Sequence, residues 1–275
     1  HFLVPCPCFL AHSFTNLLHQ VTRIKYNMSS SNAPLDFITL IQSAYNLLTT
    51  PNNNLTTPNN NGTAMQAIIN LSPISPLLQP PIPTTFPNKV ATIIDHTLLS
   101  PTMTTKDCDK LCQEAINYNF ASVCIPPSFV KRAKAALTGS QSKVCTVVGF
   151  PNGYASSAVK GYEAKVAQQE GADEVDMVCN IGLVKEITEK AEKGEWEIAA
   201  RAAEDYISDI LTVCTSVGPS VTVKCIIESG ALTDTEIAIS SLLFSESRRR
   251  NGGTSPTFIK TSTGFNGNGG ATPRS

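Results

Sequence analysis

The chain has 275 residues, of which 41% are hydrophobic and 16% charged, and its formal net charge is −1. This length allows one large domain or two small ones, and the apolar content is sufficient for a sizeable buried core. Nucleic acid is excluded as the main partner because Lys and Arg form no stripe, and no apolar run is long enough to span a membrane.

The cysteines indicate the cellular compartment, and one basic run indicates a surface loop. Nine cysteines, an odd number, argue against a disulfide framework and predict small buried thiols in a reducing compartment. Cys108 and Cys112 are four residues apart, which suits one helix face and not a Cys-x-x-Cys metal motif. Three consecutive arginines at 248–250 precede Gly-Gly and are predicted to lie in a solvated loop.

Residues 1–87 differ in composition from the rest of the chain. Thr-Thr-Pro-Asn-Asn-Asn begins at Thr49 and recurs from Thr56, and a Pro-rich stretch follows. Without a periodic apolar face, this segment is predicted to be a poorly ordered leader, with a short helix near residues 35–48. Residues 2–10 are apolar but lack a preceding basic stretch, so we expect Met28 to be the natural start and the location to be cytoplasmic.

From residue 88 to residue 275, short apolar runs alternate with helical patterns. The runs predict strands at 90–94, 121–125, 144–149, 174–178, 221–227 and 258–261. Thr104 and Asp107 suit the start of a first helix. One face of that helix, and one face of a later helix, collect apolar residues: Cys108, Leu111, Cys112, Ala115 and Ile116, then Trp196, Ala199, Ala200, Ala203, Ile207, Ile210 and Leu211. The alternation predicts a parallel sheet, either a closed eight-strand barrel or an open doubly wound sheet.

Three charged residues interrupt these apolar strands: Asp176, Lys224 and Lys260. An unpaired buried charge is costly, so one interpretation is a structural Lys–Asp pair that ties neighbouring strands together. The other is chemical, because an amine in an apolar pocket beside a second cation has a lowered pKa and attacks carbonyls. Lys260, followed by a hydroxyl-rich turn at a strand's carboxyl end, is then the nucleophile, and Asp176 moves protons around the imine.

Several segments resemble the deoxyribose-phosphate aldolase family. Phe258-Ile259-Lys260-Thr261-Ser262-Thr263-Gly264-Phe265 resembles that family's Schiff-base segment, and Glu174-Val175-Asp176-Met177-Val178 resembles its acid/base strand. Other segments match in order, among them Asp95-His96-Thr97-Leu98-Leu99, Val123-Cys124-Ile125-Pro126-Pro127 and Lys224-Cys225-Ile226-Ile227-Glu228. The resemblance covers about residues 90–271.

The resemblance implies an α/β fold of the (β/α)8 TIM-barrel class, with about six βα units in this chain. It implies reversible cleavage of 2-deoxy-D-ribose 5-phosphate to D-glyceraldehyde 3-phosphate and acetaldehyde, without metal or cofactor. Lys260 would form the imine and Asp176 would transfer protons. The residues that would bind substrate, the last four near its phosphate, are Asp95, Thr97, Cys124, Lys224, Thr261, Ser262, Thr263 and Gly264.

The family pattern continues past Ser275 for two more strand–helix units, about 60 residues, which would carry a second catalytic lysine and most of the phosphate site. Six strands would leave two unpaired edges, so we expect this chain to aggregate or stay partly molten, with Lys260 open to water. A homodimer is the candidate assembly of a full-length form. The alternative functions are another Schiff-base barrel aldolase, such as a transaldolase, and a catalytically silent remnant.

Overall fold

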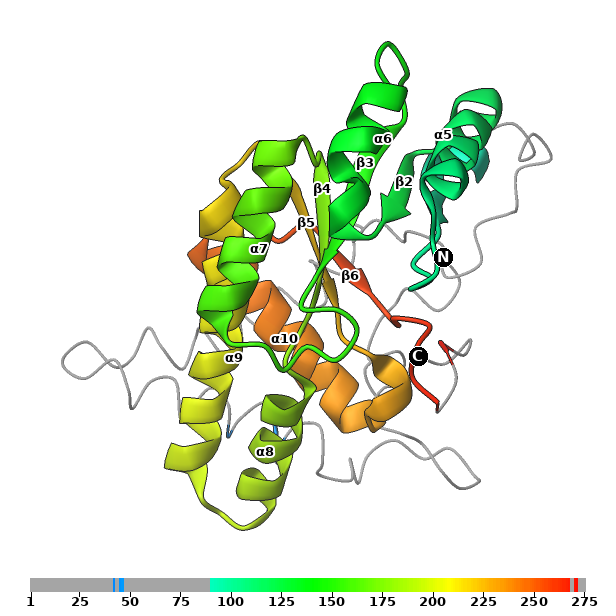
Figure 1. Cartoon of the computed structure of the whole chain (residues 1–275). Helices are drawn as coiled ribbons and strands as arrows, with labels where there is room; N and C mark the ends of the chain where they lie inside the picture. The colour runs from blue at the N-terminus through cyan, green and yellow to red at the C-terminus, as the bar shows by residue number, and fades with distance from the viewer. Residues whose placement is uncertain (1–41, 43–44, 47–89, 268–269, 272–275) are drawn as a thin grey trace, which may run out of the picture.

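A computed structural model describes residues 42, 45–46, 90–267 and 270–271. Strands and helices alternate along most of the described chain (Figure 1). The strands are β1 (Asp95–Thr97), β2 (Ser122–Ile125), β3 (Lys143–Val148), β4 (Glu174–Val178), β5 (Thr222–Ile226) and β6 (Phe258–Lys260). The main helices are α5 (Thr105–Tyr118), α6 (Val130–Ala136), α7 (Ser157–Glu170), α8 (Ile181–Glu192), α9 (Trp196–Val217) and α10 (Asp234–Arg250).

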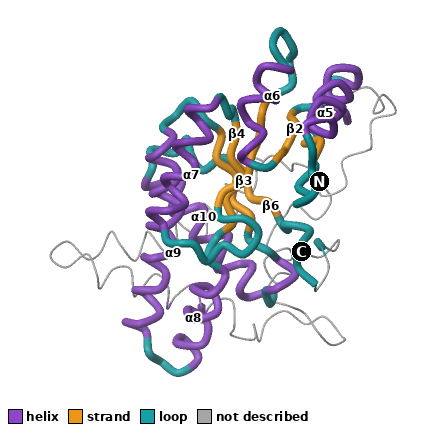
Figure 2. Tube along the Cα trace, in the orientation of Figure 1, coloured by secondary structure: helices purple, strands orange, loops and turns teal. Residues whose placement is uncertain are grey.

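The six strands form one parallel sheet in the order β1-β2-β3-β4-β5-β6. The sheet curls, and the helices lie along its outer side (Figures 1 and 2). Helix α5 contacts β1 and β2, α7 contacts β3 and β4, and α9 contacts β5. Sequential parallel strands with helices on the outside are the arrangement of a (β/α)8 TIM barrel, so the expected fold class is confirmed.

The first strand is not where the apolar run predicted it. Residues 90–94 were expected to form a strand, but Ala91–Ile93 form a short 3-10 helix that buries none of its residues. The strand is instead Asp95–Thr97, whose first residue is buried. Apolar character failed as a guide here because the buried position of β1 is filled by a carboxylate, which Ser122 Oγ binds at 2.6 Å. The other five predicted strands are confirmed to within three residues at their ends.

Side chains alternate between two environments across the sheet. The outer face packs against the helices and forms the main hydrophobic core, with Val123, Val144, Val175 and Val223 all fully buried. The inner face carries a small apolar cluster of Cys124, Cys145 and Val147, with Leu99 and Phe150 against it. The charged strand residues also lie on this inner side. The fold therefore separates a helix-covered apolar face from a polar interior.

Two helices confirm the helical periodicity read from the sequence. Helix α5 begins with the expected capping box, in which Thr104 Oγ1 accepts from the Asp107 amide and Asp107 accepts from the Thr104 amide. Its buried face holds most of the predicted set, namely Cys108, Leu111, Cys112 and Ala115, while Ile116 is 37% exposed. Helix α9 buries five of the seven predicted residues, namely Ala199, Ala200, Ala203, Ile207 and Ile210.

The three arginines at 248–250 do not lie in a loop. They form the last turn of α10, where positive side chains interact favourably with the helix dipole. Arg249 pairs with Glu246, and Arg250 pairs with Glu246 and Glu204. Arg248 donates to the Pro256 carbonyl oxygen at 2.9 Å. The prediction of a solvated loop is therefore wrong, because the helix continues to Arg250 and ends before the Gly-Gly.

Most of the predicted leader, residues 1–87, lies outside the described residues. Within it, residues 42 and 45–46 are helical, inside the stretch where a short helix was expected. The Tyr45 ring meets the Trp196 ring edge-on, with centroids 5.7 Å apart, and Tyr45 packs against the main core. Tyr45 therefore contacts the folded domain, although residues 1–87 were predicted to lack a periodic apolar face. Among the described helices, none combines the length and apolar character that crossing a membrane requires.

Candidate active site

The inner face of the sheet brings together side chains from all six strands. Asp95 comes from β1, Cys124 from β2, Cys145 from β3, Asp176 from β4, Lys224 from β5 and Lys260 from β6. Their positions follow from the register, which pairs Cys124 with Cys145, Asp176 with Lys224, and Ile226 with Lys260. All six residues are at least 92% buried. Residues that are dispersed over 166 positions of sequence therefore share one polar interior.

Lys260 and Asp176 form the central contact. Lys260 Nζ donates a hydrogen bond to Asp176 Oδ2, and the two charges form an ion pair. Lys260 also lies 3.7 Å from Asp95 Oδ2. The Lys260 residue is only 8% exposed, so the expectation that it would be open to water at the edge of the sheet is wrong. The Lys260 side chain extends inward across the sheet to Asp176. It is therefore buried although β6 is paired with β5 on one side only.

Lys224 neutralises several carboxylates at once. Its Nζ lies 2.8 Å from Asp95 Oδ2, 2.6 Å from Glu174 Oε2 and 3.3 Å from Asp176 Oδ1. Lys224 is fully buried. The interior thus holds three carboxylates and two ammonium groups, and the exposed Lys143 contacts Glu174 Oε1 from the edge at 3.1 Å. This cluster is consistent with both interpretations of the sequence: a structural Lys–Asp pair that ties strands together, and a reactive lysine beside an acid.

The carboxylates raise the pKa values of both lysines. Burial by itself would lower the pKa of Lys260, but Asp176 and the other neighbouring groups together outweigh it, and the pKa is raised above its ordinary value. The pKa of Lys224 is likewise raised, against the effect of burial. Burial raises the pKa of Asp176, but Lys224 and then Lys260 outweigh it, and that pKa is lowered. The expectation of a lowered lysine pKa is therefore wrong for this state, because it counted the second cation and left out the carboxylates.

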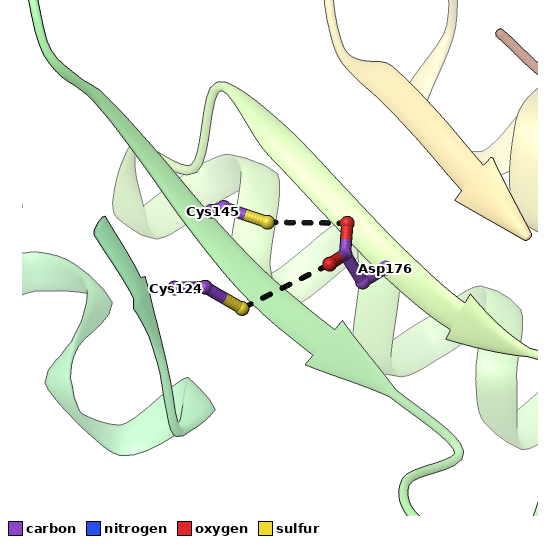
Figure 3. Close-up of side chains that lie close together, drawn as sticks. All are labelled: Cys124, Cys145 and Asp176. Atoms are coloured by element: carbon purple, nitrogen blue, oxygen red, sulfur yellow. Dashed lines mark hydrogen bonds between the residues drawn. The ribbon is translucent and has the colours of Figure 1, made fainter. Parts of the chain in front are cut away.

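Two thiols complete the surroundings of Asp176 (Figure 3). Cys145 Sγ donates to Asp176 Oδ1 at 3.2 Å and Cys124 Sγ donates to Oδ2 at 3.9 Å. Burial raises the pKa of the Cys145 thiol well above its usual range, so this group is neutral. The lowered acidity of the Cys145 thiol indicates that it donates a hydrogen bond to the carboxylate and is not a reactive nucleophile.

Cys124, Cys145 and Asp176 also offer donor atoms of the kinds that bind metal ions. Their ligand atoms lie within 4.8 Å of one another, a spacing that a thiophilic ion could bridge. However, Lys224 Nζ already lies 3.6 Å from Cys145 Sγ, and Lys260 holds Asp176 Oδ2. Two ammonium groups occupy the lone pairs that a metal would need and would repel it. The donor set therefore does not fit a bound cation while both lysines are charged.

The remaining predicted substrate-binding residues lie around the carboxyl ends of β1 and β6. Thr97 is half-buried and its Oγ1 donates to the Asp95 carbonyl oxygen at 2.9 Å. After β6, the Thr261 carbonyl accepts from Ser229 N at 2.7 Å. Ser262 Oγ is buried without a hydrogen-bond partner among the described residues. Gly264 is exposed and has φ +80°, a conformation that glycine adopts without strain.

Thr263 is directed away from the role expected of it. Both its amide and its Oγ1 donate to the carboxylate of Glu228, so neither donor is free for a phosphate. Glu228 was not selected from the sequence. It lies beyond the end of β5, where the alternation of strand faces no longer applies.

Two other residues of the cluster were missed, one of them although a signal existed. Glu174 lies two residues before Asp176 on β4, hence on the same face, and its carboxylate contacts Lys224. Cys145 is the register partner of Cys124. The period of two along a strand, applied to residues already selected, would have found Glu174. Cys145 needed the register, which the sequence alone did not supply.

A second buried ion pair lies on the helix side of β4. Lys160 Nζ donates to Asp209 Oδ2 at 2.5 Å and to the Val178 carbonyl oxygen at 2.9 Å. Burial raises the pKa of Asp209, and Lys160 opposes that rise. A hollow of about 310 Å³ beside Asp209 is lined by Tyr154, Ser157, Asn180, Asp205 and other residues, none of them from the inner face. This pair fixes the carboxyl end of the strand that bears Asp176.

Comparison of the sequence with protein-family models found no match. Comparison with curated proteins found deoxyribose-phosphate aldolases. The enzyme of Carboxydothermus hydrogenoformans is 47% identical over 184 residues, which are 67% of this chain and 72% of that protein. The enzyme of Metamycoplasma hominis is 45% identical over 172 residues, 62% of this chain and 69% of that protein.

Solved structures agree with the sequence relatives. A candidate deoxyribose-phosphate aldolase from Coccidioides immitis superposes with a TM-score of 0.60 at 32% identity, over 87% of this chain and 76% of that one. A tetrameric deoxyribose-phosphate aldolase from Aeropyrum pernix gives a TM-score of 0.53 at 27% identity, over 65% of this chain and 66% of that one. On the sequence identity, the shared curled sheet and the extent of the match, this chain belongs to the deoxyribose-phosphate aldolase family.

Proposed function

We propose that this protein cleaves 2-deoxy-D-ribose 5-phosphate reversibly to D-glyceraldehyde 3-phosphate and acetaldehyde, through an imine on Lys260. The observation that carries the proposal is the buried contact between Lys260 and Asp176, because it places an amine beside a group that can take its proton. Membership in the deoxyribose-phosphate aldolase family supplies the substrate class. The partners are a sugar phosphate and small aldehydes.

The first half of the reaction forms the imine. Lys260 is held as an ammonium, so it must lose a proton before it can attack, and the Asp176 carboxylate is in hydrogen-bond contact to accept it. The free Nζ then attacks C1 of the open-chain aldehyde. The carbinolamine loses its hydroxyl as water, and Asp176 returns the proton that this leaving group needs. The product is a protonated imine, which is an electron sink.

The second half breaks the carbon–carbon bond. The Asp176 carboxylate, restored when water left, takes the proton of the hydroxyl on C3. The C2–C3 electron pair moves into the imine, and C3 becomes the aldehyde carbon of D-glyceraldehyde 3-phosphate. An enamine remains on Lys260. Asp176 then gives its proton to C2, which restores the protonated imine, and water releases acetaldehyde and the free lysine. Asp176 is the acid and base for the nitrogen, and the thiols of Cys124 and Cys145 orient its carboxylate.

Lys224 has a different role in this proposal. It is fully buried, contacts three carboxylates and has a pKa well above its ordinary value, so it remains charged. Its three carboxylate contacts hold it as an ammonium, which keeps Asp176 ionised. Asp95, Thr97 and Cys124 line the same interior, and Thr261, Ser262 and Gly264 place backbone and hydroxyl groups beyond Lys260, towards the phosphate end.

The cellular setting is part of the proposal. Seven cysteines of the described residues are free and buried, which suits a reducing compartment such as the cytoplasm. A homodimer is the assembly that we propose for a full-length form.

The direct test is a cleavage assay on the chain with 2-deoxy-D-ribose 5-phosphate, in which released acetaldehyde is reduced by alcohol dehydrogenase and the loss of NADH is followed. Lys260→Met should abolish release, whereas Lys193→Met, an exposed surface lysine paired with Glu189, should leave it unchanged. A panel of other aldol donors, including fructose 6-phosphate, separates the transaldolase alternative. Equal release by Lys260→Met and the unaltered chain would contradict the proposal, and no release by the unaltered chain would favour the silent remnant.

A further inference from the structure

Glu228 has an unusual backbone conformation at the end of β5. Its φ is 52° and its ψ is 58°, in the left-handed region. Among the described residues, only Asn119 is another non-glycine residue with positive φ. Asparagine tolerates this region, whereas a glutamate there is strained. Such strain persists only where surrounding contacts impose it, and it is concentrated near functional sites.

The side chain of Glu228 is as unusual as its backbone. The residue is 5% exposed. Its carboxylate accepts from Thr263 N at 3.2 Å and from Thr263 Oγ1. Within the described part of the chain, these Thr263 groups are the only recorded donors to it, and no lysine or arginine forms an ion pair with it. Burying a carboxylate without a cation is costly, so this contact is not explained by stability alone.

The backbone on both sides of Glu228 is bonded to the chain around Lys260. Ile227 N donates to the Lys260 carbonyl oxygen at 3.0 Å, and Ser229 N donates to the Thr261 carbonyl oxygen at 2.7 Å. Glu228 lies between these two donors and reaches Thr263 with its side chain. Residues 227–229 therefore hold the segment that begins at Lys260 at three successive points.

Thr263 extends this attachment along the loop. Its Oγ1 donates to Glu228 and also accepts from Phe265 N at 3.0 Å. The Phe265 ring meets the Phe150 ring edge-on, with centroids 5.2 Å apart, and Phe150 packs on the inner-face cluster. The loop after β6 is thus fixed to β5 at one end and to the turn after β3 at the other.

We infer that Glu228 is a positioning residue, which acts through Thr263 and the loop 261–265 to hold Lys260 against Asp176. Glu228 has no recorded contact with the Lys260 side chain, so it is not a catalytic residue. The inference rests on the proposed function in that it assigns a purpose to the placement of Lys260. It predicts that loss of the carboxylate loosens the Lys260–Asp176 contact while the rest of the barrel is unchanged.

The test measures how the reactivity of Lys260 depends on pH. The chain is incubated with acetaldehyde and borohydride over a range of pH, and the adduct on Lys260 is quantified by mass spectrometry. The groups that set the midpoint are Asp176 and Asp95, with Lys224, Cys124 and Cys145 around them. Because Asp176 holds the lysine proton, a looser contact moves the midpoint to lower pH.

Two variants separate strain from charge, and one control checks for general effects. Glu228→Gly relieves the backbone but removes the carboxylate, and Glu228→Gln keeps one acceptor for Thr263. We expect the midpoint to fall by about one pH unit in Glu228→Gly, a tenfold change in proton affinity, and by less in Glu228→Gln. Glu236→Gln is the matched control, because Glu236 is also 5% exposed and accepts from a threonine, Thr233, but caps α10 away from Lys260.

The outcomes are distinct. An unchanged midpoint in Glu228→Gly, or an equal shift in Glu236→Gln, would overturn the inference. If the unaltered chain forms no acetaldehyde adduct, the proposed function fails instead, and the Lys260 midpoint is then measured with acetic anhydride, which acylates any free amine. Amide exchange is a check on folding: residues 261–265 should exchange at least about tenfold faster in Glu228→Gly, with the helices unaffected. Faster exchange throughout the barrel would instead show general destabilisation and overturn the local role.

Discussion

Lys260 and Asp176 lie 84 residues apart in the chain and form a hydrogen-bonded ion pair inside the sheet. The pair raises the pKa of the amine and helps to lower that of the acid, so both groups rest in their charged forms. A lysine nucleophile needs the opposite form of the amine. The contact supplies the proton acceptor that converts one into the other, which is why the resting ion pair is compatible with imine chemistry.

Replacing the acid tests this relationship. Asp176→Asn is nearly isosteric, so the fold should persist, while turnover of 2-deoxy-D-ribose 5-phosphate should fall by roughly two to four orders of magnitude. The Lys260 pKa should fall as well, because burial lowers it and the carboxylate that raises it is gone. The pH midpoint for borohydride trapping of acetaldehyde should therefore move down while turnover decreases. Unchanged turnover would leave Asp176 with a structural role only.

Removing the second lysine tests the charge balance of the interior. Lys224→Met leaves Asp95 and Asp176 with Lys260 alone, while Glu174 keeps its contact with Lys143, and we expect a loss of about 3–5 kcal/mol in the free energy of unfolding at neutral pH. Urea denaturation at several pH values measures it. The unaltered chain owes stability to the lowered Asp176 pKa, present above the ordinary value of 3.8 and lost as pH falls through the folded pKa.

The variant should lose less of its stability in acid, because its surplus carboxylate takes up a proton more readily. The difference between the two proteins should therefore narrow as the pH falls towards about 4. A difference that stays constant with pH would show that Lys224 contributes packing and not charge. Lys185→Met is a suitable comparison, since Lys185 pairs with Glu236 at the half-exposed edge of α8.

The N-terminal segment offers a prediction with an optical readout. Trp196 is the single tryptophan of the sequence, and the Tyr45 ring covers one edge of it. Tyr45→Ala should shift the tryptophan emission to longer wavelength. It should also lower the free energy of unfolding by about 0.5–1.5 kcal/mol, the usual contribution of an aromatic pair. Deleting residues 1–87 should do the same and leave cleavage activity intact. Emission that is unchanged in both variants would show that the segment is dispensable for packing too.

The sequence predicted the site where a charge interrupts an apolar strand. Asp176, Lys224 and Lys260 stood out for that reason, and the structure brings all three together. Asp95 gave no such signal, because β1 is a polar three-residue strand beside a more apolar run that remains outside the core. Its place in the pocket came only from the family resemblance.

Other features depend on relations that no local pattern contains. The direction of the lysine pKa shifts depends on how many carboxylates surround each amine. Glu174 adds one to the surroundings of Lys224 through a contact between neighbouring strands. Glu228 depends on a left-handed residue beyond the end of a strand, where the alternation of faces no longer applies. The three arginines were assigned to a loop because they precede a Gly-Gly, whereas they form the last turn of α10, which ends before the glycines.

The most direct measurement of the central claim is the position of a reduced acetaldehyde adduct. The chain is treated with acetaldehyde and borohydride, digested, and searched by mass spectrometry for a lysine that carries an ethyl group. The account predicts the adduct on Lys260, absent from Lys260→Met and retained in Lys193→Met. An adduct on Lys224, or exclusively on exposed lysines, would contradict it.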